Sequence, residues 1–194
     1  MQLEHGIHLG YCTNIHRGET WDETFSGLDQ YTRRVRDEVC PGDTPYGIGL
    51  RLSADAAAEL AADATKIDSF KRWMEKTNSY VFTINGFHYG KFHNTRVKEQ
   101  VYVPDWGTEK RLDYTNQLFD LLDELAPEGI AGSVSTLPGS FKEFITDDKA
   151  NGAAICANLK ACSDHLERLR DRTGRDLHLG LEPEPLGWFE TTPE

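Results

Sequence analysis

A glutamate at the end of an apolar segment is the first candidate for chemistry in this sequence. Residues 178–185 read His-Leu-Gly-Leu-Glu-Pro-Glu-Pro, a pattern typical of a buried strand that ends at Glu182. Pro183 and Pro185 lack a backbone N–H and have a fixed φ, so they end the strand and hold the glutamate in place. A carboxylate held in this way can bind a cation or move a proton. The alternative is a solvated acid at a strand end.

Polar residues stand at the ends of the earlier strand-like segments as well. Four such segments carry a polar residue at their last or next-to-last position: Asn14, Arg51, Asn85 and Ser135. The loops that follow add His16, His88, His93 and Glu184. Because the carboxyl ends of parallel strands meet at one edge of a sheet, these side chains are expected to converge on a pocket. The alternative is that strand ends are polar only because they reach water.

The loop after the third segment carries the densest group of candidates. Residues 85–93 read Asn-Gly-Phe-His-Tyr-Gly-Lys-Phe-His. The imidazoles of His88 and His93 can ligate a divalent metal or move a proton, and the aromatic rings can stack on a sugar. A glycine-rich turn with exposed histidines is the structural alternative. Arg51, in the second strand-like segment, is suited to hold a carboxylate or phosphate, or to pair internally with Glu182 or another acid of the barrel interior.

Strand-like and helix-like segments must alternate if these residues are to meet. Thr20 and Glu23 form a capping box before a helix over residues 21–39, a second helical region runs from Ser53 to Met74 with a break near Asp68, and Gly174 is suited to close the last helix. Two further helices are expected at residues 108–125 and 155–169. The five strands are expected at Gly6–Asn14, Tyr46–Leu52, Ser79–Asn85, Gly129–Thr136 and Leu177–Glu182.

The side-chain alternation of these strands favours one α/β architecture. One face, which would lie under helices, is apolar and includes Ile7, Leu9, Leu50, Phe82 and Ile84. The other face is small and mostly polar, with Val81, Thr83 and Ser133. A barrel interior tolerates such a face, and a doubly wound sheet, the alternative, buries both faces under helices. We therefore expect a (β/α)8 TIM barrel with only its first five strands and four helices, so that residues 1–194 form a single domain, the N-terminal part of a barrel. This expectation implies a fragment or a gene that stops early.

Composition and charge exclude several classes of function. The 194 residues carry a formal net charge of −11, which disfavours binding to nucleic acid. The sequence has no apolar run that could cross a bilayer and no secretion signal at its start, so we expect a cytoplasmic protein without membrane insertion. The four cysteines show no CxxC spacing, and GxGxxG, P-loop, GxSxG and HExxH motifs are absent.

Several motifs together resemble one known family. They are Leu-Gly-Tyr-Cys-Thr-Asn-Ile-His at 9–16, Gly-Ile-Gly-Leu-Arg at 47–51, Thr-Ile-Asn-Gly-Phe at 83–87, Ser-Thr-Leu-Pro-Gly-Ser-Phe-Lys at 135–142 and Gly-Leu-Glu-Pro-Glu-Pro at 180–185. The chain resembles the EboE family of metabolite-traffic proteins, which belongs to the xylose-isomerase-like TIM barrels. The resemblance implies a divalent-metal site (Mg²⁺, Mn²⁺ or Zn²⁺) at the carboxyl end of the barrel, with Glu182 as a ligand. Glu184 stands where xylose isomerases carry a lysine, so the resemblance does not imply sugar isomerisation by the same route.

These observations lead to one leading hypothesis. The protein is expected to be a metal-dependent, isomerase- or epimerase-like enzyme that processes a small secondary metabolite. In this hypothesis Glu182 binds metal, His88 and Glu184 move protons, and the substrate contacts Asn14, His16, Arg51, Asn85 and Ser135. Other proteins of the same metabolite pathway are expected partners. Two alternatives are a catalytically silent module that binds and hands over a metabolite, and an endonuclease-like metal phosphodiesterase.

Overall fold

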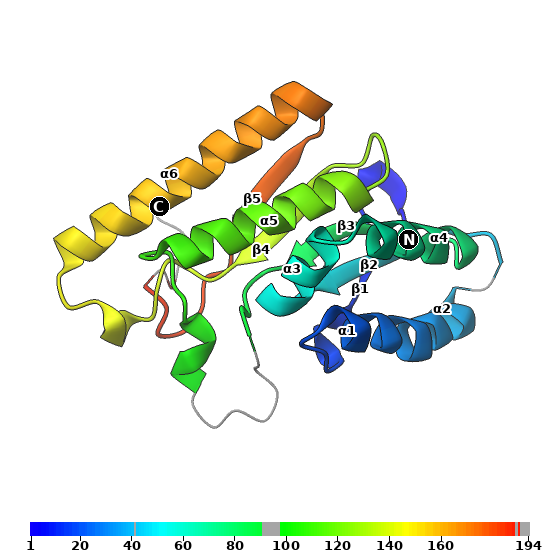
Figure 1. Cartoon of the computed structure of the whole chain (residues 1–194), viewed down its shortest axis with the longest axis horizontal. Coiled ribbons are helices and arrows are strands. Elements are labelled where there is room, and N and C mark those ends of the chain that lie inside the picture. The colour runs from blue at the N-terminus through cyan, green and yellow to red at the C-terminus, as the bar shows by residue number, and fades with distance from the viewer. Residues whose placement is uncertain (41, 91–97, 189, 191–194) are drawn as a thin grey trace.

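The fold is α/β, with one five-stranded parallel sheet (Figure 1). The computed structural model describes residues 1–40, 42–90, 98–188 and 190. All neighbouring strands run parallel, and their spatial order follows the sequence, β1-β2-β3-β4-β5, so the described sheet lacks the reversal of order that defines a doubly wound sheet. The strands are β1 Gly10–Cys12, β2 Tyr46–Arg51, β3 Ser79–Asn85, β4 Gly132–Thr136 and β5 Leu177–Leu181.

Helices connect the strands and cover one face of the sheet. Helix α5 packs on β3 and β4, and α6 packs on α5 and β5 (Figure 1). The helices are α1 Trp21–Gly27, which continues through a π-helical segment, η3 Leu28–Thr32, into α2 Arg33–Val39; α3 Ala54–Ala61; α4 Ala64–Lys76; α5 Glu109–Leu125; and α6 Asp148–Thr173. Short 3₁₀ turns are η1 Glu4–Gly6, η2 Thr13–Ile15, η4 Lys98–Tyr102 and η5 Lys142–Phe144.

The helix ends follow from local sequence signals. The predicted capping box is confirmed, because the Thr20 hydroxyl accepts from the Glu23 N–H and the Glu23 carboxylate accepts from the Thr20 N–H. Gly174 closes α6 with φ of 72°, a left-handed conformation that favours glycine. The break predicted near Asp68 is misplaced. Asp63 is the N-cap of α4, and its carboxylate accepts from Thr65, so the second helical region divides five residues earlier.

The core lies between the sheet and the helices. Ile48, Leu50, Ile84 and Val134, from three neighbouring strands, are fully buried together with Leu118 of α5. Burying one such side chain contributes roughly 2 kcal/mol to the free energy of folding. This apolar layer therefore fixes which face of each strand points towards the helices and which points away. On that other face the hydroxyls of Thr83 and Ser133 lie 2.8 Å apart, as the alternation of small polar residues predicts.

A β-bulge corrects the predicted facing of two residues in β3. Ile48 of β2 pairs with Val81, but Gly49 pairs with Thr83, so Phe82 is an extra residue in the ladder. Val81 is therefore fully buried in the helix-side core, whereas the Phe82 ring lies against His8 on the other face. The sequence-based assignment had these two facings reversed, because a period of two cannot register an inserted residue.

The first strand is shorter than predicted. Of the expected Gly6–Asn14, only Gly10–Cys12 pairs with β2, and residues 13–15 form the turn η2. The preceding segment folds back on itself, since the N–H of Leu9 donates to the carbonyl of Met1 and the Met1 amine donates to the carbonyl of Leu9. Ile7 and Leu9, predicted to be buried under helices, are instead more than half exposed.

Candidate functional site

One pocket brings most of the predicted site residues together at the carboxyl end of the sheet. It has a volume of about 610 Å³. Its lining includes Asn14, Asn85, His88, Glu182 and Glu184, which follow β1, β3 and β5 or end them. The described lining is completed by Phe87, Glu99, Val101, Tyr102, Phe141, Pro185 and Leu186. The predicted convergence of strand ends is therefore observed for these five residues.

The two glutamates reach the pocket because main-chain contacts hold their segment. The Glu182 N–H donates to the carbonyl of Thr136 over 2.9 Å, which extends the β5 ladder by one residue. Further on, the Lys142 N–H donates to the carbonyl of Leu186 over 2.9 Å. Glu182 and Glu184 are both half-buried, and both line the pocket.

Three aromatic side chains line the pocket together with these acids. The ring of Tyr102 lies 5.5 Å from that of Phe87 and 5.3 Å from that of Phe141, measured between centroids. Burial, and to a smaller degree the nearby Glu184 carboxylate, raises the pKa of Tyr102. The phenol therefore stays protonated near neutral pH and can donate a hydrogen bond. Flat apolar walls beside polar groups are typical of small-molecule sites.

Asn85 and His88 enter the pocket from the loop after β3. The Asn85 side-chain oxygen accepts from the N–H of Phe87 over 3.2 Å, which tightens the turn out of the strand. The His88 imidazole is half-buried and lies 5.1 Å from the Phe87 ring. This imidazole can transfer protons at neutral pH. His93, also predicted as a candidate, lies outside the described residues.

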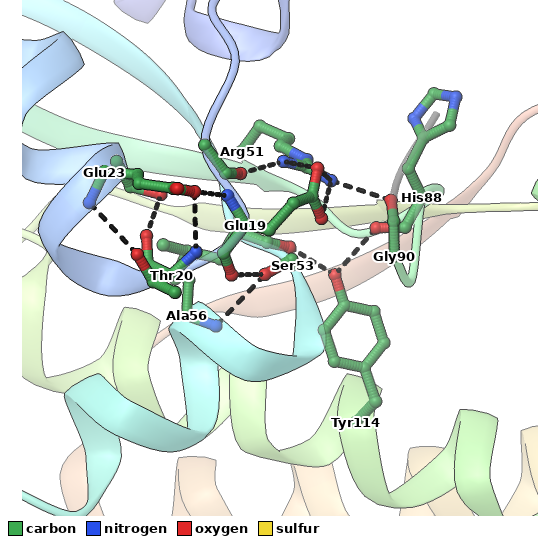
Figure 2. A network of polar contacts seen from close by, with 12 residues as sticks. Glu19, Thr20, Glu23, Arg51, Ser53, Ala56, His88, Gly90 and Tyr114 are labelled. Atoms are coloured by element: carbon green, nitrogen blue, oxygen red, sulfur yellow. Dashed lines mark hydrogen bonds and ion pairs between the residues drawn. The ribbon is translucent and has the colours of Figure 1, made fainter. Parts of the chain in front are cut away.

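Arg51 is placed differently from the other candidates. Its side chain is buried, and its guanidinium donates to the carbonyls of Gly18 and Gly90 and lies 3.3 Å from the Glu19 carboxylate (Figure 2). Of the two roles considered from the sequence, the structure shows pairing inside the protein, with Glu19 as the acid. Arg51 is not among the described residues that line the pocket.

His16 and Ser135 also lie apart from the pocket lining. The Tyr11 hydroxyl is 3.0 Å from His16 Nε2, and the His16 ring stacks on Tyr31 with centroids 4.9 Å apart. His16 and Arg51 border a separate cavity of about 10 Å³, which holds no more than one water-sized molecule. Ser135 is half-buried in β4, and its carbonyl accepts from the Gly86 N–H.

Sequence reasoning missed Phe141 and Arg111. Phe141 follows the Pro138-Gly139 turn after β4, so an apolar residue just beyond a predicted strand end was the available signal. Arg111, in the first turn of α5, is fully buried, and burial lowers its pKa to about 10, so it remains a cation at neutral pH. A charged residue in the first turn of a helix is expected to be exposed to solvent, and no pattern in the sequence indicated that Arg111 is buried.

The described residues do not assemble a complete metal site. Within 1–40, 42–90, 98–188 and 190, no three His, Cys, Asp or Glu side chains are grouped as metal ligands would be. Divalent metals commonly take three or more protein ligands in sites of this kind. Glu182 and Glu184 can each donate oxygen, but this set alone does not fit a bound ion. In the same part of the chain, no helix has the length and apolar character needed to span a membrane.

Comparison with other proteins identifies no family. The chain matches no family model, no curated protein and no solved structure.

Proposed function

We propose that the protein binds a small polar metabolite in the pocket at the carboxyl end of its sheet. The convergence of Asn14, Asn85, His88, Glu182 and Glu184 on one pocket carries this proposal. These residues belong to three chain segments that the sequence separates by up to 170 positions, and the parallel strand order explains why they meet. We further propose that the sheet is part of a (β/α)8 barrel of the xylose-isomerase-like type, in which this end of the strands holds the active site.

The chemistry we propose for the pocket is proton transfer on the bound metabolite. His88 moves a proton at one of its ring nitrogens and Glu184 at a carboxylate oxygen, while Asn85 and Asn14 hydrogen-bond to ligand hydroxyls. Such a pair supports an isomerase- or epimerase-like reaction. A divalent metal bound through Glu182 would lower the pKa of a ligand hydroxyl, but it would need ligands beyond the described residues.

The cellular setting is part of the same proposal. The resemblance of the strand-end motifs to the EboE family supports a role in secondary-metabolite processing in the cytoplasm, with other proteins of that pathway as partners. The formal net charge of −11 supports a small metabolite over nucleic acid as the ligand.

Calorimetric titration tests the proposal. A panel of aldoses, polyols and their phosphorylated counterparts is titrated into the protein with and without Mg²⁺, Mn²⁺ or Zn²⁺. We expect at least one compound to bind, and we expect Glu182→Gln and Asn85→Ala each to weaken it by about tenfold or more, the usual effect of losing a hydrogen bond to a charged or buried group. Glu75→Gln, an exposed change on α4, is the matched control.

The outcomes separate the possible functions. Binding that survives unchanged in both Glu182→Gln and Asn85→Ala overturns the pocket assignment. Binding without turnover by the wild-type protein supports a binding and hand-over role in place of an enzyme. Tight binding to abasic DNA at physiological salt, with no affinity for the sugar panel, replaces the proposal with a phosphodiesterase.

A further inference from the structure

The loop that carries His88 is held by its own main-chain carbonyls. The described segment 86–90 of this loop directly follows β3. The carbonyl of Gly86 accepts from Arg111 Nη1 over 2.7 Å, and the carbonyl of Gly90 accepts from Arg51 Nη2 over 2.9 Å. Between them, the carbonyl of Tyr89 accepts from the Ala54 N–H over 2.8 Å. Two guanidinium groups thus hold the first and the last residue of the described segment 86–90, and His88 is its middle residue.

Arg51 connects this loop to the loop that precedes α1. Besides Gly90, its guanidinium donates to the carbonyl of Gly18 and faces the carboxylate of Glu19 (Figure 2). The main chain of Glu19 is itself held, because its carbonyl accepts from the Ser53 hydroxyl, which also caps α3. The anchor of the loop at Gly90 is therefore rigid, since Arg51 is fixed at several points in the protein interior.

Arg111 holds the first residue of this segment, Gly86, and forms no salt bridge among the described residues. Its Nε donates to the carbonyl of Pro104 over 2.8 Å, and its guanidinium lies 5.9 Å from the ring of Tyr89 and 5.6 Å from that of Tyr114. Among the described residues no carboxylate forms a salt bridge with it, although it is fully buried, and the Asp105 carboxylate acts on it only electrostatically. Burying such a cation is costly, so its hydrogen bonds to the carbonyls of Gly86 and Pro104 must offset part of that cost.

The Tyr114 hydroxyl adds a contact at the centre of the loop. It donates mainly to the carbonyl of Leu52 over 2.5 Å, and the carbonyl of His88 lies 3.4 Å away (Figure 2). Burial raises the pKa of Tyr114 to about 12, so this hydroxyl keeps its proton at neutral pH. Hydrogen bonds therefore hold the main chain on both sides of His88, at Gly86 and Gly90, and the Tyr114 hydroxyl contacts the carbonyl of His88 itself.

We infer that Arg51 and Arg111 are positioning residues, which orient the His88 imidazole in the pocket by clamping the carbonyls of Gly90 and Gly86. The inference rests on the proposed function for the importance of His88, but the positioning itself is independent of any ligand. Neither arginine touches the bound metabolite. A side chain used in proton transfer must be held within a fraction of an ångström, and a loop supplies that precision only when its backbone is anchored.

The test uses NMR of the His88 ring in the full chain. The Cε1–H resonance of His88 is assigned by its disappearance in His88→Gln, and backbone hydrogen exchange is measured for the peptide covering residues 86–90. The variants are Arg51→Met, Arg51→Lys, Arg111→Met and Arg111→Lys. The matched control is Arg175→Met, because Arg175 also donates to a main-chain carbonyl, that of Pro127, but is only half-buried and lies at the opposite end of the sheet.

We expect each methionine variant to displace the His88 resonance and to accelerate exchange in 86–90 by about tenfold, as the loss of one charge-assisted hydrogen bond allows. Each lysine variant, which can still donate to one carbonyl, should restore part of both signals. Arg175→Met should change neither. If the methionine variants do not fold, the lysine variants and Tyr114→Phe decide by the same two readouts.

A His88 resonance and loop exchange that match the wild type in every folded variant overturn the inference. So does an exchange increase in 86–90 that is no larger than in Arg175→Met. If the arginine variants move His88 but His88→Gln does not alter turnover or binding, the positioning stands and the proposed role of His88 fails, so the two failures are distinguishable.

Discussion

The guanidinium of Arg51 lies 3.3 Å from the carboxylate of Glu19, and the two side chains are only 2% and 19% exposed. The pair links the end of β2 to the loop before α1. Removing one partner of such a pair leaves an uncompensated charge inside the protein. The free energy lost by that removal is therefore larger than the net stabilisation that the intact pair provides.

Removing the acid of this pair should therefore destabilise the fold. Glu19→Gln is expected to lower the free energy of unfolding by about 2 kcal/mol, below the full range for buried pairs because Glu19 keeps some contact with water. Glu124→Gln is the matched control, because Glu124 pairs with Lys71 over 3.1 Å on the surface and should cost less than about 1 kcal/mol. Urea unfolding of both variants measures the difference, and equal losses would refute a special role for the Arg51 pair.

A second prediction concerns the loop that carries Phe141. The indole N–H of the fully buried Trp106 donates to the Thr136 hydroxyl over 3.1 Å, and the Trp106 N–H donates to the carbonyl of Gly139. Thr136→Val keeps the shape but leaves the indole N–H unpaired, so we expect a loss of about 1 to 2 kcal/mol in unfolding free energy. Thr146→Val, an exposed change, should have no measurable effect. If Thr136→Val leaves the stability unchanged, the indole N–H of Trp106 has found another acceptor and this hydrogen bond is not needed.

Close backbone packing at the start of β2 makes a third prediction. A Cβ at Gly47 would lie 2.7 Å from the carbonyl oxygen of Leu9, whereas at Gly180 the nearest atom would be 4.0 Å away. Gly47→Ala should therefore destabilise the protein by about 1 to 3 kcal/mol, because the N-terminal segment must move, and Gly180→Ala should be tolerated. Thermal unfolding compares the two, and a tolerated Gly47→Ala would contradict the position of the first nine residues.

The buried thiol of Cys162 makes a prediction about alkaline pH. Burial raises its pKa from 9.0 to about 12, so above pH 9 the unfolded chain loses this proton while the folded protein keeps it. The unfolded state then binds fewer protons, and the free energy of unfolding falls as pH rises from 9 towards 12. Cys162→Ala should show a shallower decline over that window in denaturant titrations. An identical slope in both proteins would mean that the thiol is not buried.

Much of the fold was predictable because its signals are local. β3 matches the predicted range of residues 79–85, and the capping box at Thr20 and the left-handed Gly174 were read from adjacent residues. The bulge at Phe82 was not predictable, because it depends on the pairing of β3 with β2, a separate segment of the chain. The fold-back of the first nine residues was not predictable either, because main-chain hydrogen bonds hold it and no side-chain pattern marks them. An inserted residue reverses the facing of its neighbours without changing the composition of the strand.

The candidate site also contains residues whose position could be predicted from the sequence and residues whose position could not. Asn85 and Glu182 could be predicted, since a polar residue at the end of a parallel strand faces the same edge as its neighbours. Arg51 stands at such an end too, but its long side chain turns to Glu19 and Gly90, and its partners lie 32 and 39 positions away. An arginine at a strand end can line the pocket or pair with an acid inside the protein. The position of an acid in a neighbouring loop decides between the two, and no local sequence pattern shows that position.

The central claim is that a metabolite binds in the pocket between His88, Asn85 and Glu182, and an NMR titration tests it most directly. The histidine Cε1–H resonances of the protein are followed while the compound selected from the sugar and polyol panel is added. The account predicts that His88 shifts in a saturable way, while His165 of α6, which pairs with Asp120 of α5, and His178, which is exposed on β5, stay in place. A saturable shift of His165 or His178 with an unchanged His88 would contradict it.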